Sequence, residues 1–133
     1  MVPLSFSYTG IRVRDLDRAI AFYTGVLGMR LVFRMKLRKT HGEVALLRSG
    51  RSRQRLELNW YEPGSRYAKP FQVGEGLDHL AFRSGDLKKA IREFRKAGHP
   101  VVDGPHGGPK SAWIYIRDPD GLWIEINGPM TKS

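Results

Sequence analysis

The feature that most constrains the fold of this 133-residue chain is an internal repeat. With an offset of 71 residues, Asp15 matches Asp86, Tyr23 matches Phe94, and the apolar positions between them match as well. With an offset of 68, residues 56–59 (LELN) match residues 124–127 (IEIN). A difference of three residues between the offsets is ordinary loop-length variation. Because a fixed period marks a repeated structural unit, the chain is expected to fold as two similar modules related by a pseudo-twofold axis.

Each module has the pattern of a strand, a helix and three further strands. Alternating apolar residues predict strands at 6–13, 29–37, 43–48 and 53–60, and again at 77–83, 100–102, 112–117 and 122–127. Apolar residues at helical spacing follow Asp15 and Asp86, which are suitable N-caps, and Gly28 and Gly98 are suitable helix ends. Residues 104–110 are expected to form a flexible hairpin loop, and His41 and His106 are expected in exposed turns.

The predicted fold class is therefore α+β, with two tandem βαβββ modules whose mixed, mainly antiparallel sheets surround a cleft. The first module covers about residues 6–61, a polar connector about 62–75, and the second module about 76–128. Together they are expected to form one domain over residues 1–133.

The segment 117–128, RDPDGLWIEING, contains the most informative single residue. Pro119 and Gly121 favour a tight turn between two strands. In the second strand Leu122, Ile124 and Ile126 form an aliphatic face, and the opposite face carries Glu125. Because a buried, unpaired carboxylate is costly, Glu125 is expected to have a specific partner or role.

The repeat places four positions at equivalent points of the two modules: Tyr8, Glu57, His79 and Glu125. An imidazole and two carboxylates that converge in a cleft can bind a divalent cation, because Glu oxygens suit Mn²⁺, Mg²⁺ or Fe²⁺ and His nitrogen adds affinity for Ni²⁺, Co²⁺ or Zn²⁺. The repeat therefore turns three residues that are distant in the sequence into a candidate metal site.

Three segments resemble the vicinal oxygen chelate superfamily, which includes glyoxalase I, bleomycin-resistance proteins and extradiol dioxygenases. They are residues 11–32 (IRVRDLDRAIAFYTGVLGMRLV), 77–87 (LDHLAFRSGDL) and 116–126 (IRDPDGLWIEI). In pattern the chain is most similar to the glyoxalase I-like members. The resemblance implies a divalent metal (Ni, Co, Zn, Mn or Fe) held by Glu57, His79 and Glu125, and a homodimer.

The function implied by this resemblance is that of a glyoxalase I-like lyase or isomerase acting on a small, anionic substrate. Such an enzyme transfers a proton next to a carbonyl, while the metal stabilises the enediolate as a Lewis acid. The resemblance favours Glu125 as the base, with Glu57 as its symmetric partner, and it implies that Arg12 binds a substrate carboxylate.

Tyr8 departs from the superfamily pattern, which has His or Gln as the first ligand. A phenol, with a pKa near 10, is a poor ligand for these metals at neutral pH. Three consequences stay open: a metal with three protein ligands and waters, a Tyr8 that contacts substrate, or no metal. The superfamily's substrate-contacting amide is also out of register, with Asn59 as the nearby residue.

Two other interpretations stay open. Glu57 and Glu125 could form ion pairs with Arg12 or Arg83 in a cleft without metal. In that case the chain could be a metal-free protein that binds an antibiotic or toxin, as bleomycin-resistance proteins do, with Trp60 and Trp123 as stacking surfaces. The same tryptophans are candidate substrate contacts in the enzyme hypothesis.

Composition limits the remaining classes of function. The net charge is +10, but the basic residues are scattered over several segments, and no nucleic-acid motif accompanies them, so a nucleic-acid partner is not expected. The chain has no Cys, which excludes disulfides and thiolate sites. No apolar run has membrane-spanning length. We therefore expect a cytoplasmic protein with a small-molecule substrate and no membrane partner.

Overall fold

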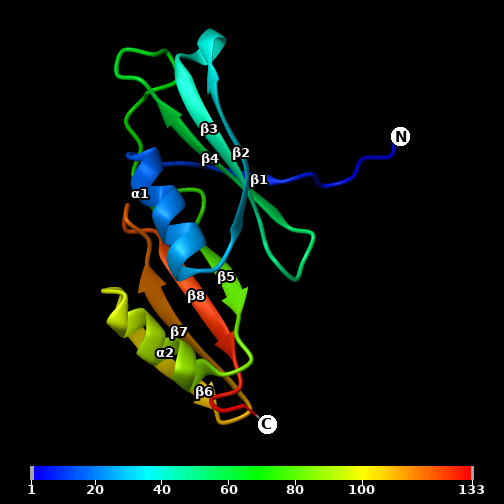
Figure 1. The fold of residues 1–133 in the computed structure, drawn as a ribbon, viewed down its shortest axis with the longest axis vertical. Coiled ribbons are helices and arrows are strands. Elements are labelled where there is room, and N and C mark those ends of the chain that lie inside the picture. The colour runs from blue at the N-terminus through cyan, green and yellow to red at the C-terminus, as the bar shows by residue number, and fades with distance from the viewer. Residues whose placement is uncertain (1, 133) are drawn as a thin grey trace. The chain divides into compact units, whose positions relative to one another are not determined.

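A computed structural model describes residues 2–132, which fall into two compact units: unit 1 ends at Pro70 and unit 2 begins at Phe71. Each unit contains one four-stranded sheet and a helix after its first strand (Figure 1). The predicted α+β class with two βαβββ modules is confirmed.

Unit 1 contains a mixed sheet with the strand order β1-β4-β3-β2. The first strand is parallel to the last, and the other pairs are antiparallel. Its elements are β1 (Thr9–Arg12), α1 (Leu16–Ala21), a π-helical segment (Phe22–Val26), β2 (Arg30–Leu37), a 3-10 turn (Arg38–Thr40), β3 (Gly42–Arg48) and β4 (Arg55–Tyr61).

Unit 2 repeats this topology with the strand order β5-β8-β7-β6, and β5 is parallel to β8. The repeat inferred from the sequence is therefore a repeat of sheet topology. Its elements are β5 (His79–Arg83), α2 (Leu87–Lys96), β6 (Asp103–Gly108), β7 (Ser111–Arg117) and β8 (Trp123–Gly128).

The two helices start in the same way. The Asp15 carboxylate accepts a hydrogen bond from the Arg18 N–H at 3.0 Å, and Asp86 accepts one from the Lys89 N–H at 3.1 Å. Each aspartate thus satisfies a backbone donor that the first helical turn leaves without a partner. The N-caps predicted from the repeat are present in both units.

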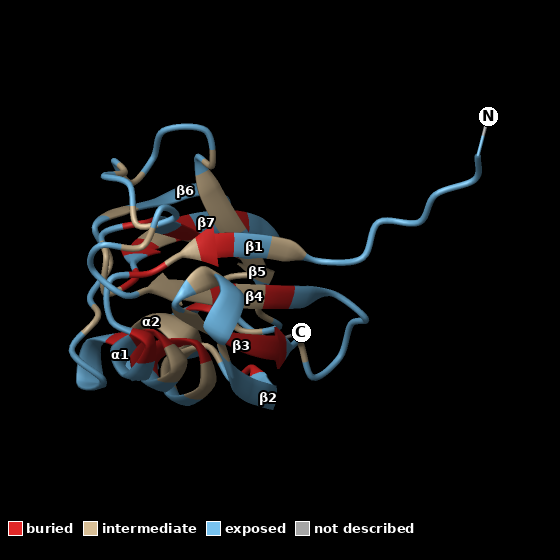
Figure 2. Ribbon diagram, turned by 90° about the horizontal axis from the view of Figure 1, so that it is seen from above, coloured by how far each residue is buried: buried red, intermediate tan, exposed pale blue. Residues whose placement is uncertain are grey.

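Each sheet buries one aliphatic face against its own helix, since α1 contacts β3 and β4 and α2 contacts β8. In Figure 2 the buried stretches of these strands are red, and β2 and the segment before β1 are pale blue. Removal of this apolar surface from water is the main stabilisation of each unit. The buried apolar residues of the strands are Ile11, Val44, Ala45, Leu46, Leu47, Leu56 and Leu58 in unit 1 and Ala112, Ile114, Ile116, Ile124 and Ile126 in unit 2, and Leu122 is buried directly before β8.

The sequence prediction for the β6 region was wrong. A strand was expected at 100–102 and a loop at 104–110, but the strand runs over Asp103–Gly108 and contains His106. Its glycines allow a close approach to β7: a Cβ at Gly107 would lie 2.5 Å from the Ser111 carbonyl oxygen. The prediction failed because the glycines of this segment were interpreted as signs of a flexible loop, whereas they allow the strand to lie close to β7.

Two other predicted boundaries differ. The first strand covers Thr9–Arg12 rather than 6–13, because its partner β4 begins at Arg55 and the register starts with Thr9 beside Leu56. The first helix changes from α to π geometry after Ala21. There the Thr24 hydroxyl donates to the Ile20 carbonyl at 2.6 Å, a contact known to bend helices. Over residues 2–132, no helix has the length and apolar character needed to cross a membrane.

Candidate active site

Strand β8 is positioned by the turn that precedes it. The Asp118 side chain is buried and accepts hydrogen bonds from the Asp120 N–H at 2.9 Å and the Leu122 N–H at 2.8 Å. Gly121 has φ +91°, which favours glycine. The turn fixes the register of the following strand, so that Leu122 lies in the core and Glu125 lies half-buried on the opposite face.

The Glu125 carboxylate is held by two neutral donors on the same sheet face. The Tyr115 hydroxyl donates to Oε1 at 3.1 Å, and the Asn127 side-chain amide donates to Oε2 at 2.9 Å. Tyr115 is on β7, directly opposite Glu125 in the ladder. The two hydrogen bonds fix the plane of the carboxylate.

His79 lies beside this carboxylate because β5 pairs with β8 in parallel. Its Nε2 is 3.9 Å from Glu125 Oε1, and its Nδ1 is 2.7 Å from Asp78 Oδ1. An ionised carboxylate only accepts hydrogen bonds, so the contact with Asp78 places the imidazole proton on Nδ1. Nε2 is then the ring nitrogen left on the Glu125 side, and a ligating histidine commonly has such an outer partner on its other nitrogen.

Tyr115 is a site residue that the sequence analysis missed. Its ring contacts His79 edge-on, with 5.6 Å between ring centroids, and it lies 5.0 Å from the ring of Trp123. Burial raises the pKa of the Tyr115 hydroxyl, and the hydrogen bond to Glu125 raises it further. The hydroxyl is therefore a neutral donor at physiological pH. Pairing the two strands through the DPDG turn would have placed residue 115 opposite residue 125 and revealed it.

Glu57 occupies the equivalent position in unit 1, on β4. It is half-buried and lies between Gly10 of β1 and Leu46 of β3 in the sheet register. A Cβ at Gly10 would lie 3.9 Å from Glu57 Oε1 and 3.2 Å from Asn59 Nδ2, so the glycine lets the Glu57 and Asn59 side chains pack over β1. Over residues 2–132, no hydrogen bond or ion pair engages the Glu57 carboxylate.

The other predicted residues of unit 1 have different surroundings. Tyr8 is exposed just before β1. Arg12 donates from Nη1 to the Tyr67 carbonyl oxygen at 3.0 Å and lies over the ring of Tyr61, 5.0 Å from its centroid. These contacts connect β1 to the segment after β4. Tyr61 is therefore a second neighbour of a candidate site residue that the sequence analysis did not identify.

The structure groups some predicted substrate contacts and separates another. Asn59 shares the Glu57 face of β4, since side chains alternate along a strand. Trp60 lies on the opposite face and is not brought together with them. In unit 2, Trp123 shares the face of Glu125 and is partly exposed, with the Arg117 guanidinium 5.7 Å from its ring centroid.

The ion-pair interpretation of the two glutamates has no support in the described part of the chain. Within residues 2–132, neither Glu57 nor Glu125 forms an ion pair with an arginine. Arg12, which the sequence analysis named as a possible ion-pair partner of the glutamates, contacts Tyr67 and Tyr61.

Comparisons with known proteins agree with this fold. Residues 5–126 match the family described as the Glyoxalase/Bleomycin resistance protein/Dioxygenase superfamily. The chain belongs to this superfamily. It is 33% identical to the lactoylglutathione lyase of Pseudomonas aeruginosa, over 96% of this chain and 87% of that protein. It is 34% identical to the Haemophilus influenzae lactoylglutathione lyase, over 95% of this chain and 94% of that protein.

Among solved structures, the trypanothione-dependent glyoxalase I of Leishmania major has a similar fold. The TM-score is 0.76 at 28% identity, over 96% of this chain and 88% of that one. The recognition of the superfamily and of its fold from sequence motifs is thus confirmed.

The donor set of unit 2 fits a divalent ion of the kind that glyoxalase I-type members of the superfamily use. Metal–nitrogen and metal–oxygen bonds are about 2.0–2.2 Å long, so two donor atoms 3.9 Å apart can share one ion. The hydrogen bond from His79 to Asp78 provides the usual outer partner of a ligating histidine. In the described residues, no three His, Asp or Glu side chains gather closely enough to hold a metal. The three-residue ligand set therefore stays a prediction.

Proposed function

We propose that this protein is a divalent-metal-dependent lyase or isomerase of the glyoxalase I type. It transfers a proton next to the carbonyl group of a small, anionic substrate. The observation that carries the proposal is the oriented Glu125 carboxylate beside His79 Nε2. The similarity to lactoylglutathione lyases over most of the chain supports it.

Glu125 is the proposed base. Tyr115 and Asn127 each donate a hydrogen bond to one of its two oxygens, so the carboxylate needs little reorganisation to accept a proton from the carbon next to the carbonyl. The same carboxyl group then returns the proton to the adjacent carbon. Glu57 is the proposed symmetric partner, since it is half-buried on the equivalent strand and no hydrogen bond or ion pair in residues 2–132 engages its carboxylate.

His79, Glu125 and Glu57 are the proposed metal ligands, and Ni, Co, Zn, Mn and Fe are the candidate ions. A divalent ion bound there would supply Lewis-acid polarisation of the substrate's oxygen atoms. Tyr8 and Arg12, together with Asn59 and Trp123, are the proposed substrate contacts. Trp60 is retained only as a secondary candidate, because it faces the other side of β4.

We also propose that the protein works as a homodimer in the cytoplasm and that its two modules form one functional domain. The outer strand β2 supports the dimer, since it exposes several large apolar side chains that an unpaired surface strand would normally avoid. They are Leu31, Val32, Phe33 and Met35.

A metal titration with a matched pair of variants tests the function. Metal-free protein should show a higher Tm with one of Ni²⁺, Co²⁺, Mn²⁺ or Zn²⁺, and this shift should shrink in Glu125→Gln. The loaded protein should isomerise the hemithioacetal of methylglyoxal and glutathione. If no metal shifts the wild-type Tm more than that of Glu125→Gln, the metalloenzyme proposal is wrong.

A metal-free binding protein of the bleomycin-resistance type is the second candidate function. The open face of unit 2 favours it, because Trp113 and Trp123 are partly exposed and could stack on an aromatic ligand. Binding of an aromatic antibiotic to the metal-free protein, without any metal-induced Tm shift, would support this candidate over the enzyme.

A further inference from the structure

The positive charge of the chain is concentrated in unit 1. Residues 1–70 contain fourteen Lys and Arg and five Asp and Glu, whereas residues 71–133 contain nine and eight. Unit 1 therefore carries +9 of the net charge of +10. A charge imbalance of this size within one unit indicates an anionic partner.

Three arginines of unit 1 stand side by side on adjacent strands. In the sheet register Arg30 of β2 pairs with Arg48 of β3, and Arg48 pairs with Arg55 of β4. Register partners share a sheet face, and neighbouring strands are about 4.8 Å apart, so the three side chains form a row of about 10 Å. All three residues are exposed. We call them the arginine row.

The arginine row has no counter-charge in the described residues. Like charges directly opposite each other destabilise a ladder, and an acidic neighbour would relieve this. Four of the five acids of unit 1 have other contacts: Asp17 and Glu43 both bind Arg34, Asp15 caps α1, and Glu62 lies 4.0 Å from His41. The fifth, Glu57, shares the face of Arg55 but forms no ion pair with it in residues 2–132. Over residues 2–132, no ion pair or hydrogen bond joins any member of the row to an acidic side chain.

In unit 2 the arginine at the position equivalent to Arg48 has an aromatic partner. There the register pair equivalent to Arg48 and Arg55 is Arg117 and Trp123. The Arg117 guanidinium lies 5.7 Å from the centroid of the Trp123 ring, a cation–π contact that needs no anion. In unit 1 the position of Trp123 is occupied by Arg55, and Arg30 adds a third guanidinium on the other side of Arg48.

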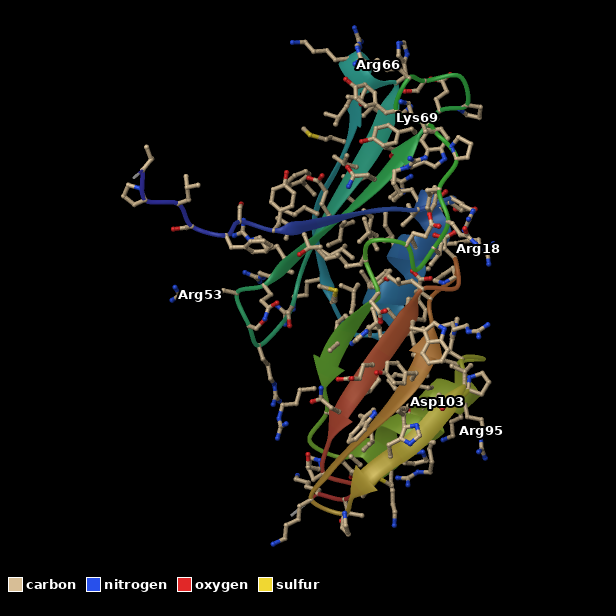
Figure 3. All side chains as sticks on the ribbon, turned by 180° about the vertical axis from the view of Figure 1, so that it is seen from behind. Arg18, Arg53, Arg66, Lys69, Arg95 and Asp103 are labelled. Carbon is tan, nitrogen blue, oxygen red and sulfur yellow. The ribbon has the colours of Figure 1, made fainter. Side chains whose placement is uncertain are left out.

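The arginine row is close to the candidate active site of unit 1. Arg55 precedes Glu57 by two residues on β4 and shares its face, about 7 Å along the strand. Arg48 stands next to Arg55 and precedes the turn of the β3–β4 hairpin. Arg51 and Arg53 lie in that turn, and the Arg53 side chain projects from its tip (Figure 3).

We propose that Arg30, Arg48 and Arg55 bind a diphosphate group, the tail of a ligand whose carbonyl end lies along the Glu57 face. Guanidinium groups bind phosphate oxygens in a bidentate manner, and a diphosphate matches a line of three positive charges better than a single carboxylate does. The inference that the carbonyl end of this ligand reacts beside Glu57 rests on the proposed function. The inference of a diphosphate site does not depend on it.

Calorimetric titration of metal-free protein with inorganic pyrophosphate and with ADP, at physiological ionic strength, tests the site. The row variant, Arg48→Gln with Arg55→Gln, should lose about 100-fold in affinity, because each charge-assisted contact contributes roughly a factor of ten. The matched control, Arg51→Gln with Arg53→Gln, removes the same charge from the same hairpin and should change affinity less than about threefold.

Two further arms complete the design. Arg48→Lys with Arg55→Lys keeps the charge and should still lose affinity, because it lacks the bidentate geometry. In the absence of ligand, the row variant should have a higher Tm than the wild type, since the repulsion is relieved. Pyrophosphate should raise the Tm of the wild type and of the control variant, but not that of the row variant.

The proposal is overturned if the wild type does not bind pyrophosphate or if the row and control variants weaken binding equally. Tight binding of a single-stranded 20-mer oligonucleotide, weakened equally by both variants, would assign the surface to nucleic-acid backbone instead. Because no metal or turnover is involved, a failure to isomerise the methylglyoxal adduct would not contradict the diphosphate site. A failure to bind pyrophosphate would in turn not contradict the proposed lyase activity.

Discussion

The two units of this protein have the same topology and place a glutamate at the same point, but they surround it differently. In unit 2 Glu125 has Tyr115 opposite it, Asn127 beside it and His79 within 3.9 Å. In unit 1 Glu57 has Leu46 opposite it and Gly10 beside it, and no described residue binds its carboxylate. Duplication has thus produced one glutamate that is oriented and one that is accessible.

From this difference we predict that the two glutamates have separate roles. A carboxylate held by fixed donors is suited to repeated proton transfer, because its geometry is already set. A carboxylate without internal partners is suited to a ligand that supplies them. The arginine row of unit 1 points the same way, since its three members form no ion pair with an acidic side chain in residues 2–132.

The largest expected effect comes from Glu125→Gln compared with Glu57→Gln. If Glu125 is the base, its variant should lose about 10²- to 10⁴-fold in kcat, the usual contribution of general base catalysis. Glu57→Gln should weaken metal binding with a smaller loss in kcat. Steady-state kinetics at saturating metal provide the measurement, and equal losses in kcat would show that the two glutamates have not separated in role.

The next largest effect should be a difference in stability between variants of the turns before β4 and β8. Asp118→Ala removes a buried acceptor for two backbone N–H groups and should lower the free energy of unfolding by about 1–3 kcal/mol. Ser49→Ala, at the equivalent position of unit 1, should change it by no more than about 0.5 kcal/mol. Urea unfolding of both variants measures this, and equal costs would refute the special role of Asp118.

A smaller effect is expected for Tyr115→Phe, which removes only the hydroxyl. Because a partner of a ligand orients that ligand, metal affinity should fall about tenfold. Tyr67→Phe, a hydroxyl deletion on an exposed ring, should leave the affinity unchanged. Competition with a chelating dye gives both values. An unchanged affinity in Tyr115→Phe would mean that Asn127 alone is enough to orient Glu125.

The smallest effect, a loss of stability on removal of a helix N-cap, should be equal in the two units. Asp15→Ala and Asp86→Ala each remove an N-cap hydrogen bond and should each cost about 1 kcal/mol in stability. Thermal unfolding of the two single variants checks the equality. A cost confined to one unit would show that the helices are not equivalent despite their matching sequences.

The sequence predicted most of the fold because the repeat supplied each element twice. Asp15 and Asp86 marked the helix starts, and the alternation around Glu125 placed it on the open face of its strand. Prediction failed at β6, where Gly107 allows a close contact with β7 that cannot be distinguished from flexibility without knowing the partner strand.

The candidate site was predicted less completely than the fold. Glu57, His79 and Glu125 followed from the repeat and the superfamily motifs. Tyr115 and the arginine row did not, because both depend on which residues face each other across a ladder. Arg30 and Arg48 are far apart in the sequence, and their charges seemed scattered until the register of β2 and β3 aligned them.

The parallel pairing of β5 with β8 also has a consequence for folding. His79 and Glu125 come from the first and last strands of unit 2, so they meet only after the contact with the greatest sequence separation in that unit has formed. Contacts of this kind close long loops and form slowly. A partly folded chain should therefore have only weak affinity for the ion, and the kinetics of metal uptake should report the last step of folding rather than the first.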